Sequence, residues 1–212
     1  VVVPQDGRSA FRIKSADAGG VLLSTGIIKT VHGGGLDLSL VPVGNVGNYA
    51  GNLKIKSIRV REAPAMAELL NAISVVGLLE QLGGQGISFA EVDSIFTLTP
   101  DRIIVKQGSA VGPSMGISMD GVYGLESGKF DMQGVLSPIY IVNAVGRLIA
   151  RKGEGLIGFN YSLRGTAAEP KVQVNPLSVL TPGIFRDIFR RPPPKGVGEP
   201  KTKPSKPSQP GR

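Results

Sequence analysis

Few residues in this chain could perform catalysis. It has one histidine, His32, and no cysteine, so Cys/His and most metal-ligand arrangements are excluded. Ser/His nucleophile sites are excluded too, except one built on His32. Asp93, Asp101, Asp120 and Asp131 fall at the ends or on the polar faces of expected strands, which predicts solvated carboxylates rather than an acid–base pair in a cleft. We therefore expect no enzyme, no catalytic or metal-ligating residue and no cofactor.

The run from His32 to Gly35 resembles a phosphate-binding loop only in its glycines. Such a loop precedes a helix and carries a Lys–Ser/Thr pair, whereas this run opens a strand at Leu36. It is predicted to form a turn, with His32 at the surface.

Most of the net charge of +8 lies at the C-terminus. Between Arg190 and Arg212 there are seven basic residues and one acidic residue, which leaves 17 basic and 15 acidic residues in the preceding body. The body has no basic patch interleaved with aromatic residues, so nucleic-acid binding is not expected. Residues 190–212 are rich in Pro and Lys and are predicted to be a disordered tail.

Alternating apolar and polar residues predict a sheet of many short strands. The expected strands are 10–14, 36–40, 53–61, 87–99, 102–109, 115–123, 129–136 and two near the C-terminus, around 157–164 and 172–174. The apolar residues change face between Ile55 and Ile58, which indicates a bulge or a change of partner.

Helices are expected to accompany this sheet. Asp17 can cap a short helix through Leu23. An apolar stripe at helical spacing spans residues 64–82, with Gly77 dividing it and Gly83–Gly84 ending it. Another helix is expected over residues 139–150, and capped helix starts occur at Asn175–Pro176 and Thr181–Pro182. The fold class predicted is β-dominated α+β, with an antiparallel curved sheet forming a β-groove and two or three peripheral or capping helices.

Apolar side chains gather on one face of the later strands. This face has two interpretations: an ordinary core covered by helices, or a partly uncovered groove that accepts acyl chains, with pliable Met side chains suited to an adaptable surface. The candidate groove residues are Met115, Ile117, Met119, Tyr123, Met132, Leu136, Ile157, Phe159 and Tyr161. A second apolar cluster, followed by two arginines, is either a cap on the sheet or a membrane-contacting end. It comprises Ile184, Phe185, Ile188, Phe189, Arg190 and Arg191.

Four blocks, in this order, carry a resemblance to a known family. They are FRIKSADAGGVLLSTG followed by VHGGGLDLSL, VREAPAMAELLNAISVVGLLEQLGGQGISFAEV, GVLSPIYIVNAVGRLI, and NPLSVLTPGIFR. Together they resemble the C-terminal region of the AsmA-like family, closest to its large YhdP-type members. The resemblance runs from about Phe11 to Phe189. Residues 143–155 depart from it, since an apolar insertion usual in the family is shortened here.

The resemblance implies a β-groove domain over residues 1–189, in a bacterial envelope protein. It implies that the chain is the C-terminal segment of a periplasmic protein anchored in the inner membrane, with the anchor outside this chain. Such a segment would bind and conduct phospholipid along an apolar groove toward the outer membrane and support outer-membrane integrity. Its expected partners are phospholipid acyl chains and a membrane surface or an envelope protein. The alternative is a non-transporting structural or docking cap of a β-solenoid. A hydrolase would need a Ser and a carboxylate beside His32.

Overall fold

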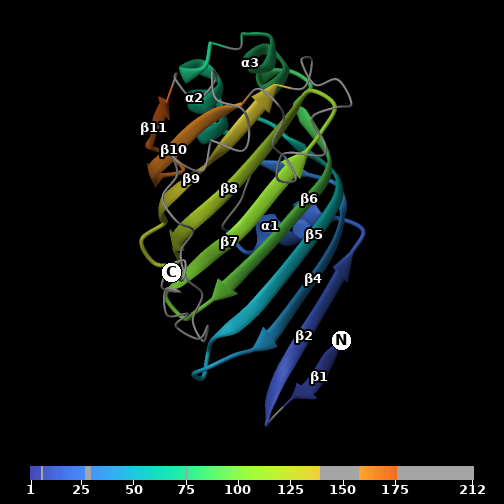
Figure 1. Ribbon diagram of the computed structural model, residues 1–212. Coiled ribbons are helices and arrows are strands. Elements are labelled where there is room, and N and C mark those ends of the chain that lie inside the picture. Colours follow the sequence, from blue (N-terminus) through green and yellow to red (C-terminus); the bar gives the residue numbers. More distant parts are fainter. Residues whose placement is uncertain (6, 27–29, 75, 139–157, 176–212) are drawn as a thin grey trace, which may run out of the picture.

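In the part of the chain that the structure describes, eleven strands form a single antiparallel sheet that is not closed (Figure 1). The computed structural model describes residues 1–5, 7–26, 30–74, 76–138 and 158–175. Neighbouring strands follow chain order, except that the short β3 pairs with β5 beside the main path. The strands are β1 (Val2–Gln5), β2 (Arg8–Ser15), β3 (Val31–His32), β4 (Gly35–Pro42), β5 (Tyr49–Val60), β6 (Ile87–Leu98), β7 (Arg102–Val111), β8 (Met115–Gly124), β9 (Lys129–Pro138), β10 (Phe159–Thr166) and β11 (Pro170–Asn175).

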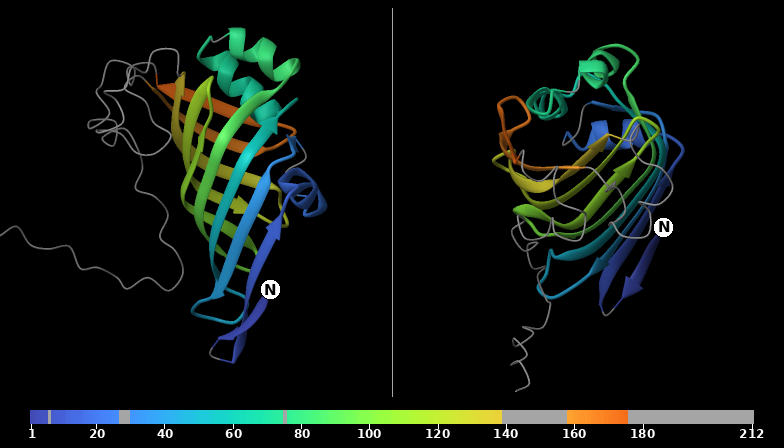
Figure 2. Two further views of the ribbon diagram at one scale, coloured as in Figure 1. Left: turned by 90° about the vertical axis from the view of Figure 1, so that its right-hand side faces the viewer. Right: turned by 45° about the horizontal axis from the view of Figure 1, so that its top comes forward.

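The two ends of the sheet differ. At one end, which we call the helix end, the connections carry three helices, α1 (Ala18–Ser24), α2 (Pro64–Ala72) and α3 (Val76–Gly83). At the opposite end, the turn end, short loops join β4 to β5, β6 to β7, β8 to β9 and β10 to β11. Figure 2 shows the sheet curving so that its two edges turn toward the side on which α1 and α2 lie. Helix α2 follows β5 in sequence and yet contacts β11, so it bridges the two sides of the curved sheet at the helix end.

Helix α1 begins where local chemistry predicts, but the break between α2 and α3 is at a different residue from the one expected. Asp17 caps α1, because its carboxylate accepts a hydrogen bond of 3.0 Å from the backbone N–H of Gly20. The expected division of the helical stripe at Gly77 is wrong, since Gly77 lies inside α3. The chain leaves α2 at Ile73 and turns at Ser74, which has a left-handed φ of 57° and donates its backbone N–H to Asn71.

Strand β5 contains the predicted change of face. Ser57 has φ 59°, and the β5–β6 ladder skips the Ser57–Ala90 pair while keeping the same register on both sides. Ile55 and Ile58 are therefore both buried in the core although three positions separate them. The left-handed backbone at Ser57 thus changes which side chains of β5 face the core, while the register with β6 is unchanged.

The core sits between the sheet and the helices at the helix end. Leu69 and Leu70 of α2 and Leu78 and Leu82 of α3 are buried, together with sheet residues such as Leu36. Within the described residues, no helix is long and apolar enough to cross a membrane.

The predicted fold class is confirmed: the protein is β-dominated α+β, and its described residues form one curved antiparallel sheet and three helices. The seven expected strands up to residue 136 and the C-terminal pair match β2 and β4–β11 within a few residues. Strands β1 and β3 were not predicted. The helix expected over 139–150, the helix starts at 175–176 and 181–182, and the tail at 190–212 lie wholly or mainly outside the described residues.

Candidate apolar face of the sheet

The register of the sheet aligns apolar side chains in four rows that cross it, the two longest from β2 to β11. Paired residues on adjacent antiparallel strands point to the same face. The four rows, from the helix end to the turn end, are Leu36–Ile55–Val92–Ala110–Ile117–Leu136–Phe159; Ile13–Leu38–Leu53–Ser94–Gly108–Met119–Gly134–Tyr161–Val174; Phe11–Leu40–Gly51–Phe96–Val105–Gly121–Met132–Leu163–Val172; and Pro42–Tyr49–Leu98–Ile103–Tyr123–Phe130–Gly165–Pro170. We call their common surface the apolar face. The helices pack against one end of this same face.

Burial along the apolar face decreases away from the helices. In the first row Leu36, Ile55 and Leu136 are at most 4% exposed. In the third row every large side chain is half-buried, from Phe11 on β2 to Val172 on β11. The fourth row is half-buried as well, apart from Pro42 and its small members. The helices therefore cover the helix end, while toward the turn end the apolar side chains keep contact with solvent.

Glycines within the rows allow large side chains to lie flat on the sheet. A Cβ at Gly51 would collide with the ring of Phe96 on the neighbouring strand. A Cβ at Gly134 would collide with the backbone carbonyl of Ser118 and would lie 2.7 Å from the hydroxyl oxygen of Tyr161. That hydroxyl donates a 2.9 Å hydrogen bond to the Ser118 carbonyl. Rings that cover glycines shield the backbone of the strand below them, a known stabilising arrangement in sheets.

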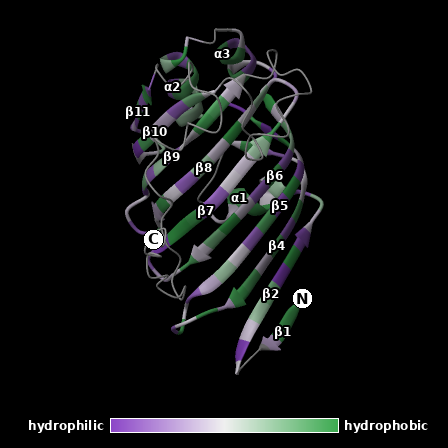
Figure 3. Ribbon diagram, viewed as in Figure 1, coloured by the Kyte–Doolittle hydropathy of each residue, from purple (hydrophilic) through white to green (hydrophobic). Residues whose placement is uncertain are grey.

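Charged side chains of the strands lie on the opposite, outer face. The alternation along each strand is visible in Figure 3. Arg12 donates to Asp37 across β2 and β4 at 2.8 Å, and Arg164 donates to Asp131 across β10 and β9 at 3.2 Å. The Arg12 hydrogen bond lowers the pKa of Asp37. In the described strands, no position of the four rows carries a charge.

One carboxylate departs from the expectation of solvated faces. Asp120 is 3% exposed and accepts a 2.8 Å hydrogen bond from the side-chain amide of Gln133 on β9. The prediction that it is solvated is wrong. Asp101, in the loop at the turn end, is exposed as expected, and hydrogen bonds from Arg102 and Thr99 lower its pKa to about 2.

The candidate groove residues lie together on the apolar face but at different depths. Met115, Ile117, Leu136 and Tyr161 are buried within the core cluster. Met119, Tyr123, Met132 and Phe159 are half-buried. Ile157 lies outside the described residues, as do Ile184, Phe185, Ile188, Phe189, Arg190 and Arg191.

Sequence reasoning missed the part of this face that is contributed by β2 and β4–β7. Its half-buried members are Phe11, Leu40, Tyr49, Phe96, Leu98, Ile103 and Val105. Alternation at Leu36, Leu38 and Leu40 was a visible signal. Only the register, however, places these residues beside Met132 and Leu163 in one row.

The arrangement suits contact with hydrocarbon. The described residues contain no group of three or more His, Asp or Glu able to hold a metal ion. His32 is exposed in β3, directly before the glycine turn, as predicted.

By its fold the protein belongs to the β-dominated α+β class with a single open antiparallel sheet. Comparison with protein-family models, curated proteins and solved structures gives no match for the chain.

Proposed function

We propose that this chain binds phospholipid acyl chains along the apolar face and conducts them past it, as the C-terminal segment of a periplasmic envelope protein. In this proposal the lipid moves between the inner and outer membranes, and the protein supports outer-membrane integrity. The observation that carries the proposal is the half-buried state of the third and fourth rows. Large contiguous apolar surfaces on proteins are rare unless they bind something.

The shape of the face favours a long, flexible ligand. The half-buried third and fourth rows cross eight or nine strands that lie about 4.8 Å apart, so they form a strip on the order of 35 Å long. Each methylene withdrawn from water is stabilised by about 0.8 kcal/mol. Because the strip is apolar throughout, an acyl chain that slides along it exchanges one apolar contact for another. Movement of this kind needs no covalent chemistry, consistent with a protein that is not an enzyme.

Native mass spectrometry combined with lipid extraction tests the proposal. The purified chain is expected to carry phospholipid. The double variant Met119→Asp/Phe159→Asp places two charges on the apolar face and is expected to lose it. Ile95→Asp is the matched control, because Ile95 is 47% exposed and lies on the outer face of β6. Equal lipid in all three folded proteins would contradict an acyl site on this face.

A second candidate function is a structural or docking cap, and the helix end favours it. There α2 bridges from β5 to β11, and residues of α2 and α3 share one core cluster with the buried members of the first row, such as Leu36 and Leu136. A segment closed in this way could end a longer β-structure and contact an envelope partner or a membrane surface. A wild-type chain that is folded and free of lipid, and that sediments with anionic vesicles, would support the cap over the conduit.

A further inference from the structure

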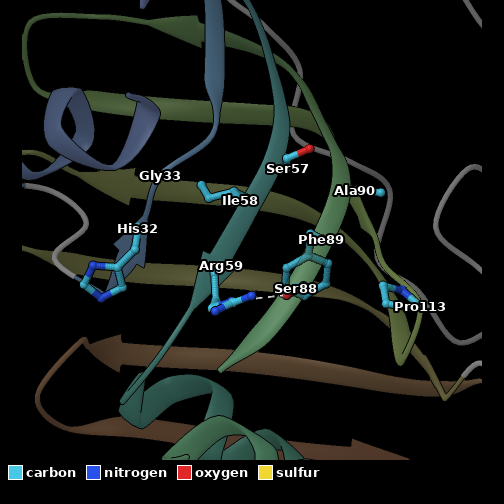
Figure 4. A pocket seen from close by; sticks show the side chains of 9 residues that line it. All are labelled: His32, Gly33, Ser57, Ile58, Arg59, Ser88, Phe89, Ala90 and Pro113. Carbon is cyan, nitrogen blue, oxygen red and sulfur yellow. Dashed lines mark hydrogen bonds between the residues drawn. The ribbon is translucent and has the colours of Figure 1, made fainter. Parts of the chain in front are cut away.

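A separate cavity lies beside Ser57 of β5 (Figure 4). Its volume is about 420 Å³. Residues from four segments line it, namely His32 of β3 with the following Gly33, Ser57, Ile58 and Arg59 of β5, Ser88, Phe89 and Ala90 of β6, and Pro113 between β7 and β8. The cavity involves none of the four rows and is independent of the proposed acyl site.

The cavity forms where the sheet is irregular. Ser57 has φ 59°, and its ladder pair with Ala90 is missing. A left-handed conformation costs a residue with a side chain about 1–2 kcal/mol. Strain of this kind concentrates at binding sites, where surrounding structure holds it in place. Here it occurs at Ser57, an exposed residue that lines the cavity.

The charge of the cavity is positive. Arg59 and His32 are register partners on β5 and β3, and both side chains are exposed. The Arg59 Nε–H donates to the Ser88 hydroxyl at 3.3 Å, which holds the guanidinium over the opening (Figure 4). Elsewhere on the outer face, Arg12 and Arg164 pair with carboxylates. Across the described residues, no ion pair joins Arg59 to a carboxylate.

These groups match a phosphate oxyanion. A guanidinium offers five N–H donors in a planar fork, imidazole donates from a ring nitrogen, and serine hydroxyls donate as well. Charge-assisted bonds from arginine to phosphate are among the strong hydrogen bonds of proteins. Ala90, Phe89 and Pro113 supply an apolar wall beside the Arg59 guanidinium. We propose that this cavity is an oxyanion site that binds a phosphate group, either as the free ion or as the headgroup of an amphiphile.

Titration of the full chain, observed by NMR at the arginine Nε–H groups, tests the site. The probes are inorganic phosphate and monomeric dihexanoyl phosphatidic acid. Each is expected to shift the Arg59 signal saturably. A lower dissociation constant for phosphatidic acid than for inorganic phosphate would assign the site to a lipid headgroup. Equal dissociation constants would assign it to free phosphate. The absence of a saturable shift with both probes would overturn the proposal.

Two variants separate this site from general attraction to basic residues. Calorimetry measures the affinity of each variant for the same two probes. Arg59→Gln is expected to weaken the affinity for these probes at least tenfold. Lys54→Gln, on the outer face of the same strand, should change it less than twofold. Equal losses in the two variants would overturn the site. Met119→Asp/Phe159→Asp should keep phosphate binding, so failure of the acyl proposal and failure of this one are distinguishable.

Discussion

Truncation of two leucines on the same strand should have very different costs. Leu36 and Leu40 both lie on β4, both face the apolar side of the sheet, and both would become alanine. Leu36 is 4% exposed in the core under the helices, whereas Leu40 is half-buried in the third row, opposite Gly51. If the turn end of the face is open, only Leu36→Ala creates a cavity.

The magnitudes follow from this difference. Replacing a fully buried leucine with alanine costs about 2–5 kcal/mol, because transfer and cavity terms add. Leu40 is already in contact with water, so Leu40→Ala removes about half of the transfer term and leaves little cavity, about 1 kcal/mol. For a chain of this size, 1 kcal/mol corresponds to roughly 2–4 °C in Tm. We therefore expect a Tm lower by at least about 5 °C for Leu36→Ala and by about 2–4 °C for Leu40→Ala.

Urea unfolding followed by circular dichroism measures both free energies, with the slope m as a check that the unfolded states are comparable. The assay should be run on protein from which lipid has been removed, since a bound ligand adds stability. Losses equal within about 0.5 kcal/mol, close to the usual spread for independent sites, would refute the reasoning. The third row would then be packed core, and the proposed acyl-binding strip would not exist.

Three further predictions concern stability. Gly134→Ala should destabilise the chain by more than about 2 kcal/mol, because its Cβ would meet the Ser118 carbonyl of the adjacent strand; a neutral result in urea unfolding would contradict that packing. Gly77→Ala should instead stabilise by about 0.5–1 kcal/mol, since nothing lies near its Cβ within α3, and a lower urea midpoint would disprove it. Arg102 and Thr99 lower the pKa of Asp101 from 3.8 to about 2, so its stabilising effect is complete above about pH 4 and is lost as the pH falls toward 2. The urea midpoint of the wild type should therefore fall more steeply over that range than that of Asp101→Asn, and parallel curves would count against the interaction.

Local patterns were sufficient for most elements of the fold. Alternation over residues 115–123 predicts β8, and Asp17 before an apolar turn predicts α1. The change of apolar face after Ile55 predicts an irregularity, and the structure has one at Ser57, although the register with β6 is unchanged and there is no inserted residue. Each of these signals lies within a few residues of the feature it predicts. Strand β1 was missed because Val1, Val2 and Val3 do not alternate with polar residues.

Other features depend on partners that are distant in the sequence. Glycine is the weaker helix former, so propensity favoured a break at Gly77, but the chain turns at Ser74. The burial of Asp120 depends on what surrounds β8 in the fold, which alternation alone does not specify. The apolar rows require the register of nine strands, and for that reason Leu40 and Phe96 could not be grouped with Met132 from sequence.

Site-specific photo-crosslinking to phospholipid tests the central claim most directly. A benzophenone amino acid would replace Leu40 or Met132 on the apolar face, and Ile95 on the outer face as the control. Each folded variant would be illuminated after expression in a bacterial envelope and analysed for attached lipid by mass spectrometry. The account predicts phospholipid adducts at positions 40 and 132 and none at position 95. Adducts at position 95 alone, or equally at all three positions, would contradict it.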